Sequence, residues 1–259
     1  MYFPKFADDV VSISVDTDIN VIRADLQKAA DELYHWSCKE CMELNIKKTK
    51  VMVFGDGQEH IEITVNLEKI ENVKTFKYLG VVLDSELNFS SHVDYTVGKA
   101  KRASAKVSRL IDGRKGIDIR TGIHLYKTLV RPHLEYAVPV WASISDKLLD
   151  TLESVQTNCI RRILGSKAHS SSSAIEVVGG VIPFRFRRRD LCTREQLRIM
   201  TLDNCHPLAE LCKTSVRKGI RFSPAEFLQV MSKQLQHAIY GYTVQNRQVC
   251  SLNSIIFPF

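Results

Sequence analysis

The sequence has no hydrophobic run long enough to cross a membrane. Its longest apolar stretches fall well short of the roughly 18 residues that a membrane span needs. Met1 leads directly into a strand-like segment, without the basic and apolar stretches of a secretory signal. We therefore expect an intracellular protein, in the cytoplasm, the nucleus or both, with no membrane partner.

The cysteines do not form the even set of a disulfide framework. Seven are scattered along the chain: Cys38, Cys41, Cys159, Cys192, Cys205, Cys212 and Cys250. An odd, scattered set predicts free thiols in a reducing compartment and no disulfide-linked partner. The pattern His35-x-x-Cys38-x-x-Cys41 has a spacing that could hold zinc. It lies on a predicted helix without a second Cys/His pair at zinc-finger distance, so we expect helix-packing thiols.

Signals for hydrolytic chemistry are also missing. Ser170 to Ser173 lack the Gly-x-Ser-x-Gly context of a hydrolase nucleophile. His124 and His133 have no partner that would make a catalytic pair, so we expect structural roles for both.

The composition is that of an ordinary globular protein with an excess of positive charge. The 259 residues are 44% hydrophobic and 25% charged, which is enough for one or two domains. The net charge of +7 suits a polyanionic partner. The sign alone does not separate a nucleic-acid-binding protein from a merely soluble basic one.

The most informative stretch is Phe6-Ala7-Asp8-Asp9-Val10-Val11. Val11 to Val15 alternate apolar and small polar residues, as a half-buried strand does, which places the two aspartates in or beside the turn of a β-hairpin. Neighbouring carboxylates oppose each other's ionisation, and a hard divalent cation such as Mg²⁺ relieves this repulsion. Asp8 and Asp9 are therefore candidate metal ligands. The alternative is a solvated turn, which aspartate favours through its own hydrogen bonds.

The first ninety residues predict an α+β arrangement. Apolar residues at steps of three and four predict an amphipathic helix from Ile19 to about Leu44, where Asn45 can end it in the left-handed conformation. Strands are expected at 51–54, at 61–65 and from Val73 to Val82, with Gly80 marking a bulge inside the last strand. The result is an antiparallel sheet with a helix across one face.

The remainder of the chain is predicted to be mainly helical. Helices are expected at 92–110, from Ile119 to a break before Pro132, at about 146–164 and at about 190–202. Ser166 to Ser173 are interpreted as a serine-rich linker. The Arg185–Arg189 run is expected on a solvated face, with phosphate contact as the alternative. The tail shows helical periodicity around 225–239 and no motif to which we assign a role.

Four segments in order resemble a reverse transcriptase of the non-LTR, LINE-type and jockey-like retrotransposons. The segments are Phe6–Asp9, Leu33–Trp36, Leu44–Lys50 and Phe76–Val81. The resemblance continues through Leu125–Ala137, Trp141 and Gln156–Gly165, and it thins out past about Leu208. It implies an α+β partial polymerase palm over 1–90, a helical thumb over 91–165, the linker over 166–173, and a helical connection with a poorly defined tail over 174–259.

The resemblance also implies roles for individual residues. Asp8 matches the metal-binding aspartate of the paired-Asp motif, and Asp9 matches its supporting neighbour, with Mg²⁺ or Mn²⁺ as the metal. Lys48 matches the lysine of the Asn-x-x-Lys-Thr motif near the incoming triphosphate, where a cation could offset charge developing on pyrophosphate. Tyr78, Leu79 and Gly80 match the primer-grip hairpin, where a close approach of the backbone to the primer strand would explain the glycine.

The implied partners are an RNA template, a DNA primer and deoxynucleoside triphosphates. One helix offers basic residues that could follow the phosphates of template and primer without reading bases: Lys99, Lys101, Arg102, Lys106 and Arg109.

The sequence shows only part of what this family uses. In the family the fingers and another catalytic aspartate precede the paired-Asp motif, whereas seven residues precede Asp8 here. A two-ion site needs carboxylates from both strands. We therefore expect no polymerisation by this chain alone, and we see no endonuclease or ribonuclease H domain. The alternatives are a non-enzymatic nucleic-acid-binding remnant that uses the basic thumb, and a non-functional relic that aggregates through an exposed sheet edge.

Overall fold

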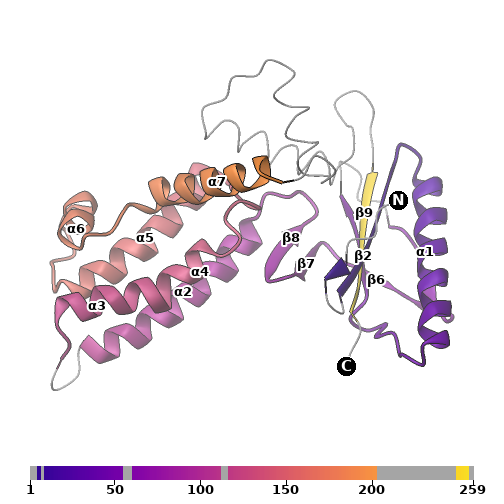
Figure 1. Cartoon of the computed structure of the whole chain (residues 1–259), viewed down its shortest axis with the longest axis horizontal. Helices are drawn as coiled ribbons and strands as arrows, with labels where there is room; N and C mark the ends of the chain where they lie inside the picture. The colour runs from indigo at the N-terminus through magenta and orange to yellow at the C-terminus, as the bar shows by residue number, and fades with distance from the viewer. Residues whose placement is uncertain (1–4, 7–8, 55–59, 112–115, 203–248, 257–259) are drawn as a thin grey trace, which may run out of the picture. The chain divides into compact units, whose positions relative to one another are not determined.

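The chain folds into two compact units. The computed structural model describes residues 5–6, 9–54, 60–111, 116–202 and 249–256 (Figure 1). The first unit combines residues 1–87 with residues 234–259, and the second unit holds residues 88–233. No helix in the described ranges has the length and apolar character that a membrane crossing requires.

A five-stranded sheet forms the centre of the first unit, in the order β1-β2-β9-β3-β6. The strands are β1 (Lys5–Phe6), β2 (Asp9–Asp16), β3 (Lys50–Phe54), β6 (Glu71–Asn72) and β9 (Val249–Ile256). All neighbours are antiparallel except β3 and β6, which pair in parallel. The predicted sheet is therefore present, with one parallel pair that the periodicity did not indicate.

Strand β9 comes from the far end of the chain and lies between β2 and β3. It pairs with β2 from Asp9↔Ile256 to Asp16↔Val249, and with β3 from Lys50↔Ser254 to Phe54↔Cys250. Because β9 is antiparallel to both neighbours, β2 and β3 point in the same direction. No pattern in the sequence of this tail predicted a strand.

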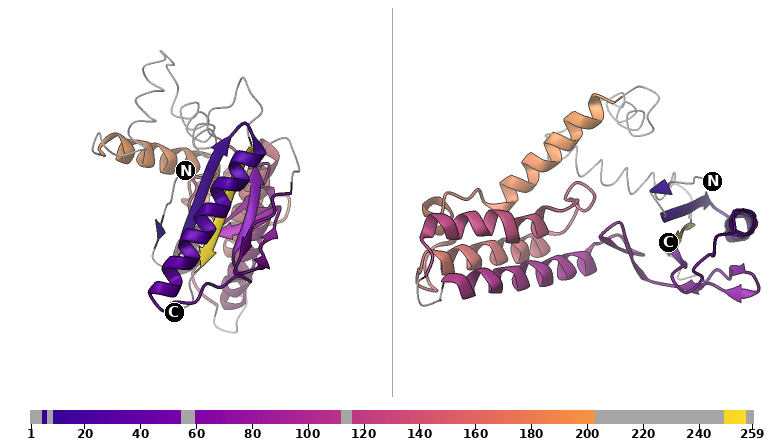
Figure 2. Two further views of the ribbon diagram at one scale, coloured as in Figure 1. Left: turned by 90° about the vertical axis from the view of Figure 1, so that its right-hand side faces the viewer. Right: turned by 60° about the horizontal axis from the view of Figure 1, so that its bottom comes forward.

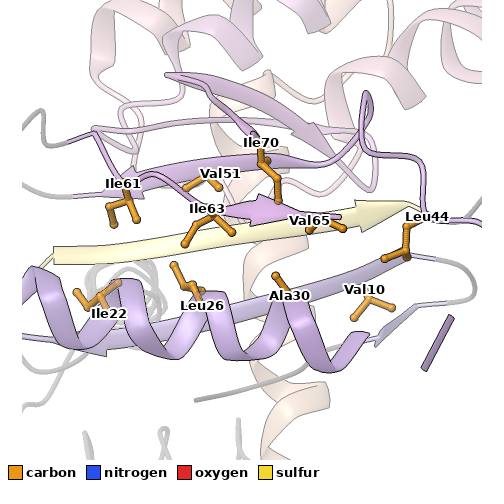
Figure 3. Close-up of a cluster of buried hydrophobic side chains, with 10 residues drawn as sticks. All are labelled: Val10, Ile22, Leu26, Ala30, Leu44, Val51, Ile61, Ile63, Val65 and Ile70. Atoms are coloured by element: carbon orange, nitrogen blue, oxygen red, sulfur yellow. The ribbon is translucent and has the colours of Figure 1, made fainter. Parts of the chain in front are cut away.

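Helix α1 (Ile19–Lys39) covers one face of the sheet. The Asp18 side chain accepts a hydrogen bond from the Asn20 backbone N–H and caps the helix. Figure 3 shows side chains of α1 pointing towards the strands, where they join one buried apolar cluster. The cluster consists of Val10, Ile22, Leu26, Ala30, Leu44, Val51, Ile61, Ile63, Val65 and Ile70.

The helix ends earlier than its periodicity predicted. It stops at Lys39, and Cys41 adopts the left-handed conformation with a φ of 55°. The predicted stop, Asn45, organises the following turn instead. Apolar periodicity continues through Leu44 because that residue packs into the same core from the loop.

Two small hairpins complete the first unit. One joins β4 (Thr64–Val65) and β5 (Glu68–Lys69), and the other joins β7 (Thr75–Tyr78) and β8 (Val81–Asp84). The single strand predicted from Val73 to Val82 is therefore wrong. Gly80 lies in the turn between β7 and β8, and its φ of 83° explains the glycine better than a bulge does.

The second unit is a helical bundle (Figure 2). Its helices are α2 (Ser90–Ile111), α3 (Ile119–Leu125), α4 (Arg131–Glu135), α5 (Asp146–Ile163), α6 (Ser172–Val178) and α7 (Phe184–Met200). The predicted start of α7 lies six residues after the observed start at Phe184. The serine-rich segment, predicted as a linker, contributes the first turn of α6. The periodicity predicted around 225–239 lies outside the described residues.

Pro132 does not break the second predicted helix. One π-helical stretch, η1 (Tyr126–Val130), follows α3, and Pro132 then lies in the first turn of α4. A proline in a first helical turn costs no internal hydrogen bond, because the first N–H groups have no partner within the helix. The wider π turn lets the chain continue past the proline without the predicted break.

A buried polar chain links three elements of this bundle. The Tyr126 hydroxyl donates to Gln156 Oε1 at 2.6 Å, and Gln156 Nε2 donates to Glu176 Oε1 at 2.9 Å. Burial raises the pKa of both the Tyr126 hydroxyl and the Glu176 carboxyl. These hydrogen bonds join η1, α5 and α6 at fixed positions.

Candidate nucleic-acid interface and acidic hairpin

The two aspartates lie where β1 turns into β2. Phe6 pairs with Asp9 and Lys5 with Val10, so the two strands form the hairpin that the sequence predicted. Asp9 is the first residue of β2 and is half-buried. Asp8 lies outside the described residues, so its role as a metal ligand stays a prediction.

The strand beside Asp9 offers no second carboxylate. Its neighbour β9 has the sequence VCSLNSII, without aspartate or glutamate, and Ile256 occupies the position opposite Asp9. The described residues contain no group of three or more His, Cys, Asp or Glu side chains that could hold a metal ion. A two-ion centre needs several carboxylates, so the donors around Asp9 among the described residues do not fit one.

Asn45 explains the Asn-x-x-Lys-Thr motif in structural terms. Its backbone carbonyl accepts hydrogen bonds from the backbone N–H groups of Lys48 (3.1 Å) and Thr49 (3.0 Å). Its side-chain Oδ1 accepts a second bond from the Lys48 N–H at 3.1 Å. Thr49 is buried, and its hydroxyl donates to the Asn45 carbonyl. This anchored turn leaves the Lys48 side chain exposed immediately before β3.

Asp9 and Lys48 lie at the same end of the sheet. Val11, Ser254 and Lys50 share one row across β2, β9 and β3. Asp9 comes two residues before Val11, and Lys48 comes two residues before Lys50. One strand separates β2 from β3, so the backbones at this end are about 10 Å apart, or two strand spacings.

The β7–β8 turn is electrostatically coupled to the acidic strand. Tyr78 pairs with Val81, and the turn residues Leu79 and Gly80 have φ values of 43° and 83°. Two successive positive φ angles are typical of a type I′ turn. Burial, together with the negative charge of Asp9, raises the pKa of Tyr78. Asp9 and the Lys48 turn thus lie at one end of the five-stranded sheet, whereas the Tyr78–Gly80 turn belongs to the separate two-stranded sheet of β7 and β8.

In the second unit, helix α2 presents a row of basic residues. Lys99, Arg102, Lys106 and Arg109 follow each other at steps of three and four, which places them on one helix face. Lys101 precedes Arg102 by one residue and therefore points about 100° away. Among the described residues, none of these five side chains forms an ion pair.

The positive potential of this row is visible at a neighbouring histidine. Burial, followed by the charges of Lys99, Arg102 and Lys106, lowers the pKa of His133 on α4. His133 therefore borders the basic face, and within the described part of the chain no hydrogen bond gives His133 or His124 a catalytic partner. The Lys99 ammonium also lies 4.8 Å from the centre of the Tyr95 ring, a cation–π contact.

The Arg185–Arg189 run does not form the solvated face that the sequence predicted. Arg185 lies within 4 Å of Asp146, Asp150 and Glu153 on α5. Arg187 forms hydrogen bonds to both carboxylate oxygens of Glu135, at 2.8 and 3.2 Å. Arg188 is largely buried and donates to the carbonyl oxygen of Ala142. Of the four arginines in this run only Arg189 is exposed, because carboxylates and one backbone carbonyl from other elements hold Arg185, Arg187 and Arg188.

The two cysteines of the His-x-x-Cys-x-x-Cys pattern are exposed rather than packed. Cys38 and Cys41 are free thiols near the end of α1, so the expectation of helix-packing thiols is wrong for both. The described cysteines Cys159 and Cys192 are also free thiols, and these two are buried.

Sequence reasoning missed the residues that hold the second unit together. Tyr126 and Gln156 were part of the family resemblance, but only the structure pairs them. Trp141 likewise packs its ring 5.3 Å from the ring of His92, and its Nε1 donates to the Tyr136 carbonyl. These polar and aromatic side chains occupy positions where the apolar periodicity places core residues, and this is the feature of the sequence that could have identified them.

Comparison with known proteins shows which class of protein the sequence of this chain resembles. The chain is 25% identical over 172 residues to the RNA-directed DNA polymerase from mobile element jockey of Drosophila funebris. The corresponding jockey protein of Drosophila melanogaster is 24% identical over the same length. Each match covers 66% of this chain and 19% of the relative, so the chain spans about a fifth of these proteins.

A second group of retrotransposon proteins agrees. The retrovirus-related Pol polyprotein from type-1 retrotransposable element R1 3 of Nasonia vitripennis is 23% identical, with 79% of this chain and 62% of that protein covered. No family model and no solved structure matches. The homologues of this chain are thus reverse transcriptases. More particularly, they are those of jockey-like and other non-LTR retrotransposons, as the sequence motifs indicated.

Proposed function

We propose that this chain carries palm and thumb parts of a non-LTR reverse transcriptase and binds template–primer duplex without polymerising alone. In this proposal residues 1–90 are the partial palm, 91–165 the thumb, 166–173 the linker and 174–259 the connection with its tail. The strand β9 in that tail is then part of the palm sheet, so the connection comprises only the helices that precede β9.

One observation carries the assignment of the first unit. Two motifs that are far apart in sequence, Asp9 of the acidic hairpin and the turn of Lys48, lie at one end of the five-stranded sheet, and the negative charge of Asp9 also acts on Tyr78 in the separate β7–β8 hairpin. A carboxylate, an exposed ammonium and a tight hairpin are the groups that a nucleotidyl-transfer site arranges around a primer end. If Asp8–Asp9 were only a solvated turn, there would be no reason for these motifs to lie close together.

The neighbouring strand explains why we expect no chemistry from the isolated chain. In the family, divalent ions stabilise the attacking and leaving oxygens during nucleotidyl transfer. Here β9 lies beside Asp9 without a carboxylate, so the chain alone lacks donors on the adjacent strand. The same strand pairs with both β2 and β3, so these two strands are not adjacent to an open gap in the sheet, and β1 and β6 are its edge strands.

The basic face of α2 supports binding to the phosphate backbone. Lys99, Arg102, Lys106 and Arg109 lie along one side of a single helix without carboxylate partners among the described residues. No aromatic side chain is required for such contacts, because they follow the backbone rather than the bases. Binding should therefore be independent of sequence and sensitive to salt.

Binding of a fluorescent RNA–DNA hybrid over a series of salt concentrations tests this proposal. Each phosphate contact contributes about 0.9 to the slope of log K against log salt for duplex DNA. Arg102→Ala should reduce the slope by about one such unit. Lys101→Ala is the matched control on the same helix, because it lies off the basic face and should change the slope little.

Two results would count against the proposal. The first is no detectable binding of hybrid by the parent chain at low salt. The second is an equal effect of Arg102→Ala and Lys101→Ala, which would mean that the row on α2 has no special role.

A further inference from the structure

We propose that a pocket between α3 and the end of α6 binds an acidic peptide segment, through its carboxylates and through one or two of its apolar side chains. The pocket lies within the second unit, and the inference does not depend on the proposed function. It rests on the size of the pocket, on the chemistry of its lining and on the aliphatic side chains exposed at it.

The pocket has a volume of about 710 Å³, within the range of sites that enclose a small ligand or a few side chains. Residues of α3 and η1 line one side, and the end of α6 lines the other; Figure 1 shows both helices at the same end of the bundle. Both sides pack closely on α5, because a Cβ at Gly122 would lie 2.7 Å from Ile163, and a Cβ at Gly179 would lie 2.8 Å from Ile160. The pocket is therefore held in place by the core of the bundle.

The α3 side of the pocket is basic. Arg120, His124 and Lys127 follow each other at steps of four and three and all line the pocket. Among the described residues, no aspartate or glutamate lines it, and neither Arg120 nor Lys127 forms an ion pair. The Lys127 ammonium donates only a long hydrogen bond, of 3.4 Å, to the carbonyl oxygen of Gly180. A concave site lined by cations without carboxylate partners attracts anionic groups.

Aliphatic side chains are exposed at the same pocket. Ile119 on the α3 side is 52% exposed, and Val178, the last residue of α6, is 73% exposed. Val177 and Ile182, which flank this end of α6 in the sequence, are also more than half exposed. Covering such groups releases them from water and is favourable, so the pocket suits a ligand that carries apolar side chains as well as negative charge.

This combination favours a peptide over a nucleic acid. Phosphate groups gain nothing from aliphatic side chains, and the described lining contains no Phe, Tyr or Trp ring on which a base could stack. A peptide with Asp or Glu beside Leu, Ile, Val or Phe offers a partner to each side of the pocket.

Selection from a display library of random 12-residue peptides, with the full chain as the target, tests the proposal. We expect the enriched peptides to carry Asp or Glu close to Leu, Ile, Val or Phe. The most enriched peptide is then synthesised with a fluorescent label, and its affinity for each variant of the chain is measured by fluorescence anisotropy.

Two variants separate the basic side from the aliphatic side. Arg120→Glu should weaken peptide binding roughly five- to tenfold, and it should not unfold α3, because Arg120 is exposed and glutamate is favourable in a first helical turn. Val178→Ser removes an exposed aliphatic group and should weaken binding about tenfold. Lys147→Glu is the matched control for charge, since Lys147 is exposed on α5 and lies 13 residues, or about 20 Å, before Ile160. It should change the affinity less than about twofold.

Four results would overturn the proposal. They are the enrichment of no peptide or only of peptides without acidic residues, an equal loss of affinity in Arg120→Glu and Lys147→Glu, and an unchanged affinity in Val178→Ser. The fourth is displacement of the peptide by an unlabelled RNA–DNA hybrid whose own binding is lost in Arg120→Glu but kept in Lys147→Glu, which would assign the pocket to nucleic acid.

Discussion

His92 should make the stability of the second unit depend on pH. It lies near the start of α2 with 2% of its surface exposed, and its ring packs against Trp141. Burial, with a smaller contribution from Lys99, lowers the pKa of His92 from 6.5 to about 4. Above pH 6.5 the histidine is neutral in both the folded and the unfolded chain. Between pH 6.5 and pH 4 the unfolded chain takes up a proton that the folded chain does not, so stability falls as the pH falls.

The size of the effect follows from the shift in pKa. One pKa unit corresponds to 1.36 kcal/mol, so a shift from 6.5 to about 4 makes the free energy of unfolding fall by about 2–3 kcal/mol between pH 7 and pH 4. His92→Gln removes this titration, and its free energy of unfolding should vary less with pH by about that amount. Other groups titrate equally in both proteins and cancel in the comparison.

Urea unfolding followed by tryptophan fluorescence measures this difference. The chain has two tryptophans, so Trp36→Phe in all proteins leaves Trp141 as the reporter of the second unit. His124→Gln is the matched control, because His124 is exposed on α3 and should leave the pH dependence unchanged. Equal pH dependence in the parent and His92→Gln would refute the reasoning that burial keeps this imidazole neutral.

Four further substitutions test the packing and the turns. Tyr126→Phe leaves its buried glutamine partner without a donor and should lower the free energy of unfolding by about 1–3 kcal/mol in urea. Gly122→Ala places a Cβ 2.7 Å from Ile163 Cγ2 and should lower the free energy of unfolding by about 1–3 kcal/mol. Gly98→Ala meets only the end of an arginine side chain at 3.5 Å and should stabilise its helix by up to about 1 kcal/mol. Equal shifts of the melting temperature in the two variants would contradict this account. Leu79→Asn places a residue that tolerates positive φ in the type I′ turn and should stabilise the first unit by about 1 kcal/mol. An unchanged melting temperature would argue against backbone strain at Leu79.

Local patterns predicted the elements whose residues interact with near neighbours. The apolar steps of α1, α2 and α5 marked real helices, because each buries one face against a core. The acidic hairpin was also predictable, since alternation in β2 follows directly after the two aspartates. Family resemblance pointed to the segments of Lys48 and Tyr78, which the structure shows to be tight turns before β3 and between β7 and β8.

Interactions between distant residues could not be predicted in the same way. No local feature of the tail indicates that Val249–Ile256 pairs with β2 and β3. The continuation of the helix through Pro132 depends on a π turn that periodicity does not reveal. Arg185 and Arg187 of the Arg185–Arg189 run are paired with acidic residues of α5 and α4, and only the tertiary structure brings these residues together.

Primer extension tests the central claim most directly. The purified 259-residue chain is incubated with an RNA template annealed to a DNA primer, deoxynucleoside triphosphates, and Mg²⁺ or Mn²⁺. Our account predicts that the chain binds the duplex and that the primer is not extended, because the strand beside Asp9 supplies no carboxylate. Template-dependent extension that Asp8→Ala abolishes would contradict it.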